Sequence, residues 1–152
     1  MLADGTLAPE FDLPDQSGKR HTLASLLSTG PLILYFYPAD FTPGCTKEAC
    51  SFRDLHDELR KARLRVVGVS PQDSDSHRKF AERHGLNFLL LADPDKRTVK
   101  AYGVDGPLGL GVRRGTYLIG PDRKIQTSVL ADLRIGAHEQ FVRKAITAGA
   151  LK

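Results

Sequence analysis

Three runs of consecutive apolar residues predict strands that are buried on both faces. Residues 32–37 form the longest run, bounded by Pro31 and Pro38, and residues 65–70 and 88–91 form two shorter ones. A strand with apolar side chains on both faces is typical of a sheet that is covered on both sides, as parallel sheets are. We therefore expect these three segments to form the centre of one sheet.

Apolar residues at spacings of three and four predict helices between these strands. The first helix carries one apolar stripe, formed by Ala49, Phe52, Leu55, Leu59 and Ala62. Further helices are predicted over residues 76–84, 94–102 and 137–148. The helix over residues 76–84 is expected to be capped near Ser74 and to end at Gly85, because glycine commonly follows the last helical residue.

Two clusters of turn-forming residues predict β-hairpins. Asp-Gln-Ser-Gly at residues 15–18 predicts a hairpin near the N-terminus, and Gly-Pro-Asp-Arg at residues 120–123 predicts a second hairpin. Helices between successive strands imply parallel pairing, and the late hairpin adds an antiparallel edge. We therefore predict an α/β protein with a thioredoxin-like fold, in which helices flank a central mixed sheet and an N-terminal β-hairpin precedes it. A single domain is expected over residues 1–152.

Composition agrees with a globular protein. Hydrophobic residues make up 41% and charged residues 26% of the 152 residues, which excludes disorder as the main state. The longest uninterrupted apolar run is six residues, whereas a membrane span needs roughly 20. The first residues contain no apolar segment of the kind found in a secretory signal, so the expected location is the cytoplasm and no membrane contact is expected.

The charge of the chain does not predict a nucleic-acid partner. The formal net charge is +4, and the densest basic cluster, residues 60–65, lies at the end of a predicted helix, where it complements the helix dipole. No aromatic residues accompany that cluster. Glycine-rich residues 103–115 lack the spacing of a nucleotide-binding loop, and two cysteines without neighbouring histidines are too few for a zinc site. We therefore expect no cofactor and no metal.

The candidate chemistry lies at the start of the first helix, at Cys45. Thr42 is predicted to cap this helix and Pro43 to occupy its first position, where the missing N–H costs nothing. Cys45 then occupies the third helical position. Free backbone N–H groups and the positive end of the helix dipole favour a thiolate there, so we expect Cys45 to be reactive.

A second cysteine, Cys50, follows five residues later. On an ideal helix this spacing separates the two Cα atoms by ~8.6 Å and by ~140° around the axis. A disulfide tolerates at most ~7 Å between Cα atoms. The two cysteines can therefore form a disulfide only if at least one turn of the helix unwinds first.

These residues resemble the active-site signature of the peroxiredoxins. The pattern P-x-x-x-T-x-x-C is present as Pro38, Thr42 and Cys45. The second cysteine at Cys50 makes the chain similar to the bacterioferritin-comigratory-protein branch, also called peroxiredoxin Q. The resemblance extends over nearly the whole chain, through residues 69–80, 90–93, 100–104 and 114–119.

The resemblance implies a role for each of five residues. Cys45 would be the peroxidatic nucleophile that becomes a sulfenic acid, and Cys50 would resolve it into an intramolecular disulfide. Thr42 would hydrogen-bond the peroxide and the thiolate, and Arg114 would stabilise the thiolate and the leaving oxygen. Pro38 would shield the site from water. The implied partners are hydrogen peroxide or organic hydroperoxides and a thioredoxin- or glutaredoxin-like reductant, and the implied oligomeric state is a monomer.

Two other functions remain open from the residues alone. The first is a dithiol–disulfide oxidoreductase on the same fold, although such enzymes usually carry C-x-x-C rather than the C-x-x-x-x-C formed by Cys45 and Cys50. The second is a copper or zinc chaperone, which would need a third ligand near the two cysteines.

The sequence also gives expectations for the two neighbouring arginines, for Glu48 and for the histidines. Strand alternation places Arg114, rather than Arg113, on the same face as Thr116, so we prefer Arg114 as the functional arginine. We expect Glu48 to lie on a solvated helix face, with an orienting contact as the alternative. Four of the five histidines are expected to be exposed, namely His21, His77, His84 and His138.

Overall fold

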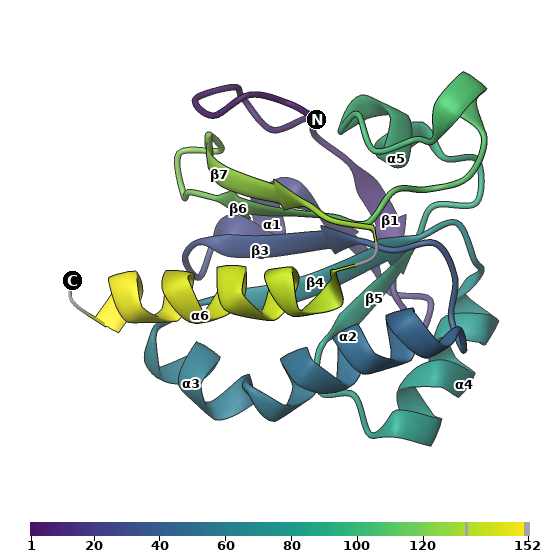
Figure 1. The fold of residues 1–152 in the computed structure, drawn as a ribbon, viewed down its shortest axis with the longest axis horizontal. Coiled ribbons are helices and arrows are strands. Elements are labelled where there is room, and N and C mark those ends of the chain that lie inside the picture. Colours follow the sequence, from purple (N-terminus) through teal and green to yellow (C-terminus); the bar gives the residue numbers. More distant parts are fainter. Residues whose placement is uncertain (133, 151–152) are drawn as a thin grey trace.

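The computed structural model describes residues 1–132 and 134–150, so the single domain predicted over residues 1–152 includes a few residues outside the described ones. Its centre is a five-stranded sheet with the strand order β5-β4-β3-β6-β7 (Figure 1). The strands are β3 (Leu32–Phe36), β4 (Arg65–Ser70), β5 (Leu89–Ala92), β6 (Gly115–Ile119) and β7 (Ile125–Leu130). β3, β4 and β5 are parallel, whereas β6 and β7 are antiparallel to their neighbours. The predicted mixed sheet is therefore confirmed.

The N-terminal segment forms the predicted hairpin and one helix that was not predicted. β1 (Asp12–Pro14) and β2 (Arg20–Thr22) pair as a separate two-stranded sheet. Helix α1 (Leu23–Leu27) follows directly, and Thr22 caps it through reciprocal hydrogen bonds with Ser25. A helix of five residues is too short to show an apolar periodicity in the sequence.

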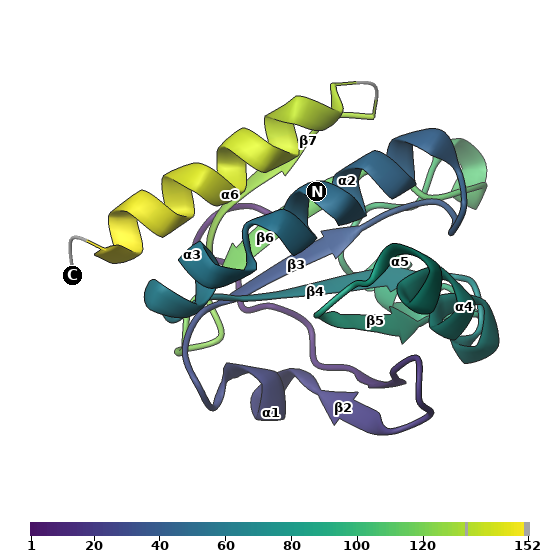
Figure 2. The same ribbon diagram turned by 90° about the horizontal axis from the view of Figure 1, so that it is seen from below.

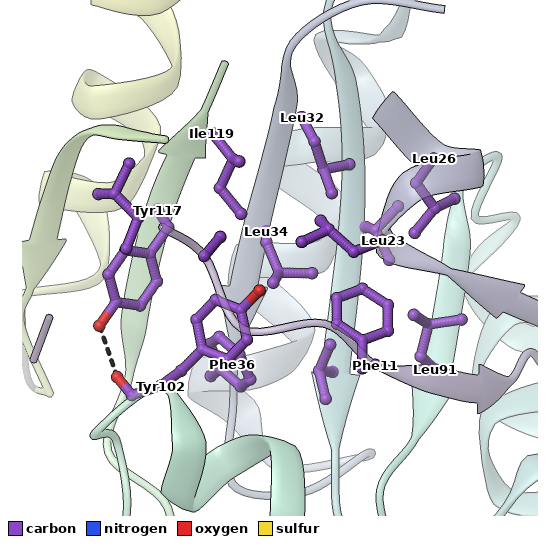
Figure 3. Close-up of a cluster of buried hydrophobic side chains, with 14 of the residues drawn as sticks. Phe11, Leu23, Leu26, Leu32, Leu34, Phe36, Leu91, Tyr102, Tyr117 and Ile119 are labelled. Carbon is purple, nitrogen blue, oxygen red and sulfur yellow. Dashed lines mark hydrogen bonds between the residues drawn. The ribbon is translucent and has the colours of Figure 1, made fainter. Parts of the chain in front are cut away.

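Helices cover both faces of the sheet (Figures 1 and 2). The helices on one face are α2 (Pro43–Asp54), α3 (His56–Lys61), α4 (Ser74–His84) and α6 (Ile135–Ala150). The other face packs against α1, the N-terminal segment and α5 (Arg97–Ala101). Figure 3 shows this second core, in which Phe11, Phe36 and Tyr102 pack together. Both faces of β3 are buried, as the sequence predicts.

Helix boundaries differ from the predicted ones in all four predicted helices, the last of which, α6, spans Ile135–Ala150 rather than residues 137–148. The predicted first helix is two helices, because Leu55, with φ −89° and ψ 5°, interrupts it between α2 and α3. α4 begins at Ser74, and its cap is Asp73, whose side chain accepts a hydrogen bond from the backbone N–H of Ser76. α5 begins only at Arg97, since residues 94–96 form a turn.

Strand pairing determines which segments meet at the end of β3. β6 runs antiparallel to β3, and Phe36 lies opposite Gly115. Arg114, the residue before β6, therefore lies beside the point where the chain leaves β3. From that point the chain continues through residues 38–42 into α2. The topology thus brings the start of α2 and the start of β6 together.

Tyr35 anchors α2 to the sheet. Its ring packs edge-on against Phe52 of α2 at 4.8 Å between centroids, and it stacks on Tyr37 at 5.3 Å. Gly68 of β4 lies against the ring, and a Cβ atom at this position would be 2.8 Å from it. The missing side chain of Gly68 therefore makes room for the ring that holds α2 in place.

No helix within the described residues is long and apolar enough to cross a membrane.

Candidate active site

Cys45 lies in the first turn of α2, at the predicted position. Thr42 is the N-cap residue and Pro43 begins the helix, so Cys45 is the third helical residue. The side chain of Cys45 is buried, with 1% of the residue exposed. The hydroxyl of Thr42 does not cap the helix and donates instead to the carbonyl oxygen of Ala39 at 3.1 Å.

The guanidinium of Arg114 connects Cys45 to Glu48. Its Nη2 donates to Cys45 Sγ at 3.2 Å, and its Nη1 donates to Glu48 Oε1 at 2.8 Å. The Arg114 side chain is only 8% exposed. A buried cation requires negative charge nearby, and both partners of this guanidinium are groups that can carry it. The neighbouring Arg113 points to the surface and pairs with Asp132 at 2.8 Å, which agrees with the preference for Arg114.

The expectation that Glu48 lies on a solvated face is wrong. Glu48 is 1% exposed, and it follows Cys45 by three residues, which places both on the inner face of α2. Its Oε2 has no hydrogen-bond partner among the described residues. Burial raises the pKa of Glu48 to about 7, although the neighbouring Arg114 acts in the opposite direction. The spacing from Cys45 was the sequence signal for this contact.

His138 of α6 continues the cluster behind Glu48, so the expectation that it is exposed is also wrong. Its Nδ1 lies 3.6 Å from Glu48 Oε2 and 2.8 Å from the hydroxyl oxygen of Thr116. Its Nε2 lies 2.9 Å from the carbonyl oxygen of Ala131. Burial lowers the pKa of His138. Nothing in the local sequence of α6 indicates this partner.

Asp40 fixes the loop between β3 and α2. Its carboxylate accepts hydrogen bonds from the Tyr37 hydroxyl at 2.7 Å and the Ser76 hydroxyl at 2.8 Å. It also lies 2.7 Å from Nδ1 of His77, and both side chains are fully buried. The other ring nitrogen of His77 faces the carbonyl oxygen of Leu91 at 3.1 Å. His77 is fully buried in this network, so the expectation of an exposed His77 is wrong.

The same loop holds Phe41 in a left-handed backbone conformation, with φ 65°. For a bulky residue this conformation costs about 1–2 kcal/mol. Contacts on both sides of Phe41 maintain it. The backbone N–H of Asp40 donates to the side chain of Gln72 at 2.6 Å, and the ring of Phe41 packs edge-on against Phe80 at 5.2 Å.

Pro38 lies at the entrance to this cluster. It is exposed, and it lines a surface hollow of about 520 Å³ together with Arg114 and Asp132. The hollow therefore borders the guanidinium that contacts Cys45.

Cys50 lies on the same helix as Cys45. It is half-buried, and both cysteines are free thiols in a helix that runs without interruption from Pro43 to Asp54. An intact helix through both residues agrees with the prediction that a disulfide requires unwinding. Within residues 1–132 and 134–150, no three His, Cys, Asp or Glu side chains are grouped so that they could hold a metal ion.

The fold and this cluster define a class of protein. A mixed sheet between two helical layers, with a buried cysteine in the first turn of the helix that follows the central strand, is the arrangement of thioredoxin-like thiol proteins. The buried arginine beside that cysteine distinguishes the site from a bare cysteine pair.

Comparison with known proteins identifies the family. Residues 5–128 match the model of the AhpC/TSA family. A Mycobacterium tuberculosis protein named as a peroxiredoxin is 42% identical over 140 residues, which cover 90% of this chain and 91% of the relative. The chloroplastic peroxiredoxin Q of Triticum aestivum is 41% identical over 126 residues, covering 82% of this chain and 58% of the relative.

Solved structures agree with this comparison. Peroxidoxin BcpB of Mycobacterium tuberculosis superposes with a TM-score of 0.91 at 38% identity, covering 97% of this chain and 98% of that one. The bacterioferritin comigratory protein of Xanthomonas campestris has a TM-score of 0.84 at 31% identity, covering 92% of both chains. The chain therefore belongs to the AhpC/TSA family, in its bacterioferritin-comigratory-protein or peroxiredoxin Q branch.

The hydrogen bond from Tyr37 to Asp40 is expected to stabilise the active-site loop. Tyr37→Phe should lower the free energy of unfolding by about 1–3 kcal/mol, because a buried carboxylate oxygen loses its donor. Tyr35→Phe is the matched control, since the hydroxyl of Tyr35 is buried without a hydrogen-bond partner among the described residues. Urea unfolding of both variants measures the difference. Equal losses in the two variants would contradict the role of Asp40.

Glu48 is expected to make stability depend on pH. Its pKa rises from 4.5 to about 7 on folding, so the folded protein holds the proton more tightly. This contribution is complete below pH 4.5 and is lost as the pH rises to about 7. The free energy of unfolding of the wild type, relative to Glu48→Gln, should fall by about 1.4 kcal/mol per pH unit over this range. Denaturant titrations at several pH values measure this, and a difference independent of pH would contradict it.

Proposed function

We propose that this protein is a thiol peroxidase that reduces hydrogen peroxide and organic hydroperoxides through Cys45. One observation carries the proposal, namely the 3.2 Å contact between Cys45 Sγ and the buried guanidinium of Arg114. The guanidinium and the N-terminal end of α2 both favour the thiolate, which is the nucleophilic form of cysteine. Membership of the peroxiredoxin Q branch supports the same chemistry.

The first half-reaction forms a sulfenic acid on Cys45. The thiolate attacks the terminal oxygen of the peroxide, an S–O bond forms, and the O–O bond breaks. The departing alkoxide or hydroxide takes up one proton and leaves as alcohol or water. Arg114 stabilises the leaving oxygen, and its Nε is buried without a partner among the described residues. Thr42 exchanges its bond to Ala39 for one to the peroxide, and Pro38 shields the site from water.

The second half-reaction forms a disulfide. The thiol of Cys50 attacks the sulfur of the sulfenic acid, the S–S bond forms, and water leaves. Because both cysteines lie in α2, this step requires part of the helix to unwind. A dithiol of the thioredoxin or glutaredoxin type then reduces the disulfide by thiol–disulfide exchange, which oxidises the reductant and restores both thiols.

We further propose that the protein acts as a monomer in the cytoplasm. The resolving cysteine lies in the same helix as the peroxidatic one, so the catalytic cycle closes within a single chain. A disulfide that must be reduced in every cycle suits a compartment that keeps thiols reduced.

Arginine variants test the proposed function directly. Arg114→Lys should lower the second-order rate of peroxide reduction by about 10²–10³-fold, because a lysine cannot donate to Cys45 and Glu48 as the planar guanidinium does. Cys45→Ser should be inactive. Arg113→Lys is the matched control and should retain the wild-type rate within about twofold, since surface ion pairs contribute little. Stopped-flow measurement of peroxide consumption distinguishes the three variants. Equal rates for Arg114→Lys and Arg113→Lys would contradict the role assigned to Arg114.

Oxidation is expected to unwind part of α2. Stoichiometric peroxide should lower the helical circular-dichroism signal of the wild type as the Cys45–Cys50 disulfide forms, and dithiothreitol should restore the signal. Cys50→Ser should complete a single turnover to the sulfenic acid and keep its helical signal. An oxidised wild type with a verified disulfide and an unchanged helical signal would overturn the unwinding step.

A further inference from the structure

The contacts of Glu48 and His138 leave one proton unassigned. Nε2 of His138 faces the carbonyl oxygen of Ala131 at 2.9 Å, so this nitrogen carries a hydrogen. In a neutral ring Nδ1 is then an acceptor, and the hydroxyl oxygen of Thr116 lies 2.8 Å from it. The same Nδ1 lies 3.6 Å from Oε2 of Glu48, which has no hydrogen-bond partner within residues 1–132 and 134–150. Two acceptors that face each other away from water are unfavourable, and one proton between them removes the conflict.

The charges of the buried cluster lead to the same conclusion. A thiolate at Cys45, a guanidinium at Arg114 and a carboxylate at Glu48 would together carry one net negative charge. Burying a net charge is costly, and a proton on the pair formed by Glu48 and His138 makes the cluster neutral. When Cys45 becomes a neutral sulfenic acid, Arg114 loses the thiolate as its counter-charge. The carboxylate of Glu48 then becomes its remaining counter-charge, which favours loss of the proton.

We propose that Glu48 and His138 together hold one proton while Cys45 is a thiolate and release it when the sulfenic acid forms. This inference rests on the proposed peroxidase function and adds a proton store to it. Thiolate and hydroperoxide give sulfenic acid and alkoxide, and the released proton balances the one that the alkoxide takes up. When a dithiol later reduces the disulfide, one of its two hydrogens remains on Cys50 and the other returns to the pair.

Apart from Cys45, the surrounding groups do not compete for this proton. Among the described residues, the charged and titratable groups around the pair are Cys45, Tyr35, Arg114, Asp132 and, on α6 itself, Glu139. Burial raises the pKa of Tyr35 well above its usual range, so this hydroxyl stays neutral. Asp132 pairs with Arg113 and Glu139 with Arg143, both at the surface. Burial also raises the pKa of Glu48 and lowers that of His138, which places the proton mainly on the carboxyl group.

Infrared spectroscopy tests the proposal on the full chain. The Cys50→Ser protein stops at the sulfenic acid, so its reaction with one equivalent of hydrogen peroxide isolates the first half-reaction. The difference spectrum should show loss of the C=O band of a protonated carboxyl group, and this band should shift in D₂O. Adding Glu48→Gln should abolish the signal. Glu139→Gln is the matched control, because this carboxylate is accessible to water, and should leave the signal intact.

Proton counting provides a second test that needs no Glu48 variant. Without a store, a thiolate that becomes a sulfenic acid takes one proton from solution, which a pH indicator in weak buffer reports. We expect uptake well below one proton per sulfenic acid in Cys50→Ser near neutral pH.

The outcomes separate the two proposals. Sulfenic acid that is trapped by dimedone without a change in the carboxyl band, together with uptake of one full proton, would overturn the proton store and leave the peroxidase function intact. Absence of any sulfenic acid on Cys45 would overturn the peroxidase function and, with it, the proton store.

Discussion

The buried guanidinium of Arg114 is the charge on which the arrangement of the site depends. A cation beneath the surface must be compensated, and the fold supplies Cys45 and Glu48 from one face of α2 for this purpose. No local sequence signal produces this meeting, because 69 residues separate Arg114 from Cys45. It follows from the antiparallel pairing of β6 with β3, which places the start of β6 beside the start of α2.

The sequence predicted those parts of the fold that local patterns determine. The strand at residues 65–70 was predicted with its observed bounds, and Cys45 was placed correctly in its helix, because proline and threonine define that helix start. Helix α1 was missed because five residues show no periodicity. The interruption at Leu55 was also missed, since the apolar stripe continues across it and only the backbone changes direction.

Buried polar residues are the part of the structure that the sequence predicts least well. Glu48, His77 and His138 were all expected at the surface, because isolated polar residues usually lie there. Each is buried only because a distant segment provides its partner, as Asp40 does for His77 across 37 positions. The spacing of Glu48 from Cys45 was a usable signal. For the two histidines the tertiary structure alone provides the explanation.

The depth of the active site has a consequence for how dissolved salt affects the enzyme. Cys45 and Glu48 are each 1% exposed, so counterions in solution do not reach the charges that act on the thiolate. Hydrogen peroxide is uncharged, and its reaction with Cys45 should therefore proceed at the same rate in dilute and concentrated salt. The proposed protein reductant must instead approach a surface on which acidic and basic side chains are exposed to those ions. On the proposed mechanism, ionic strength thus acts unequally on oxidation by peroxide and on reduction by a dithiol protein.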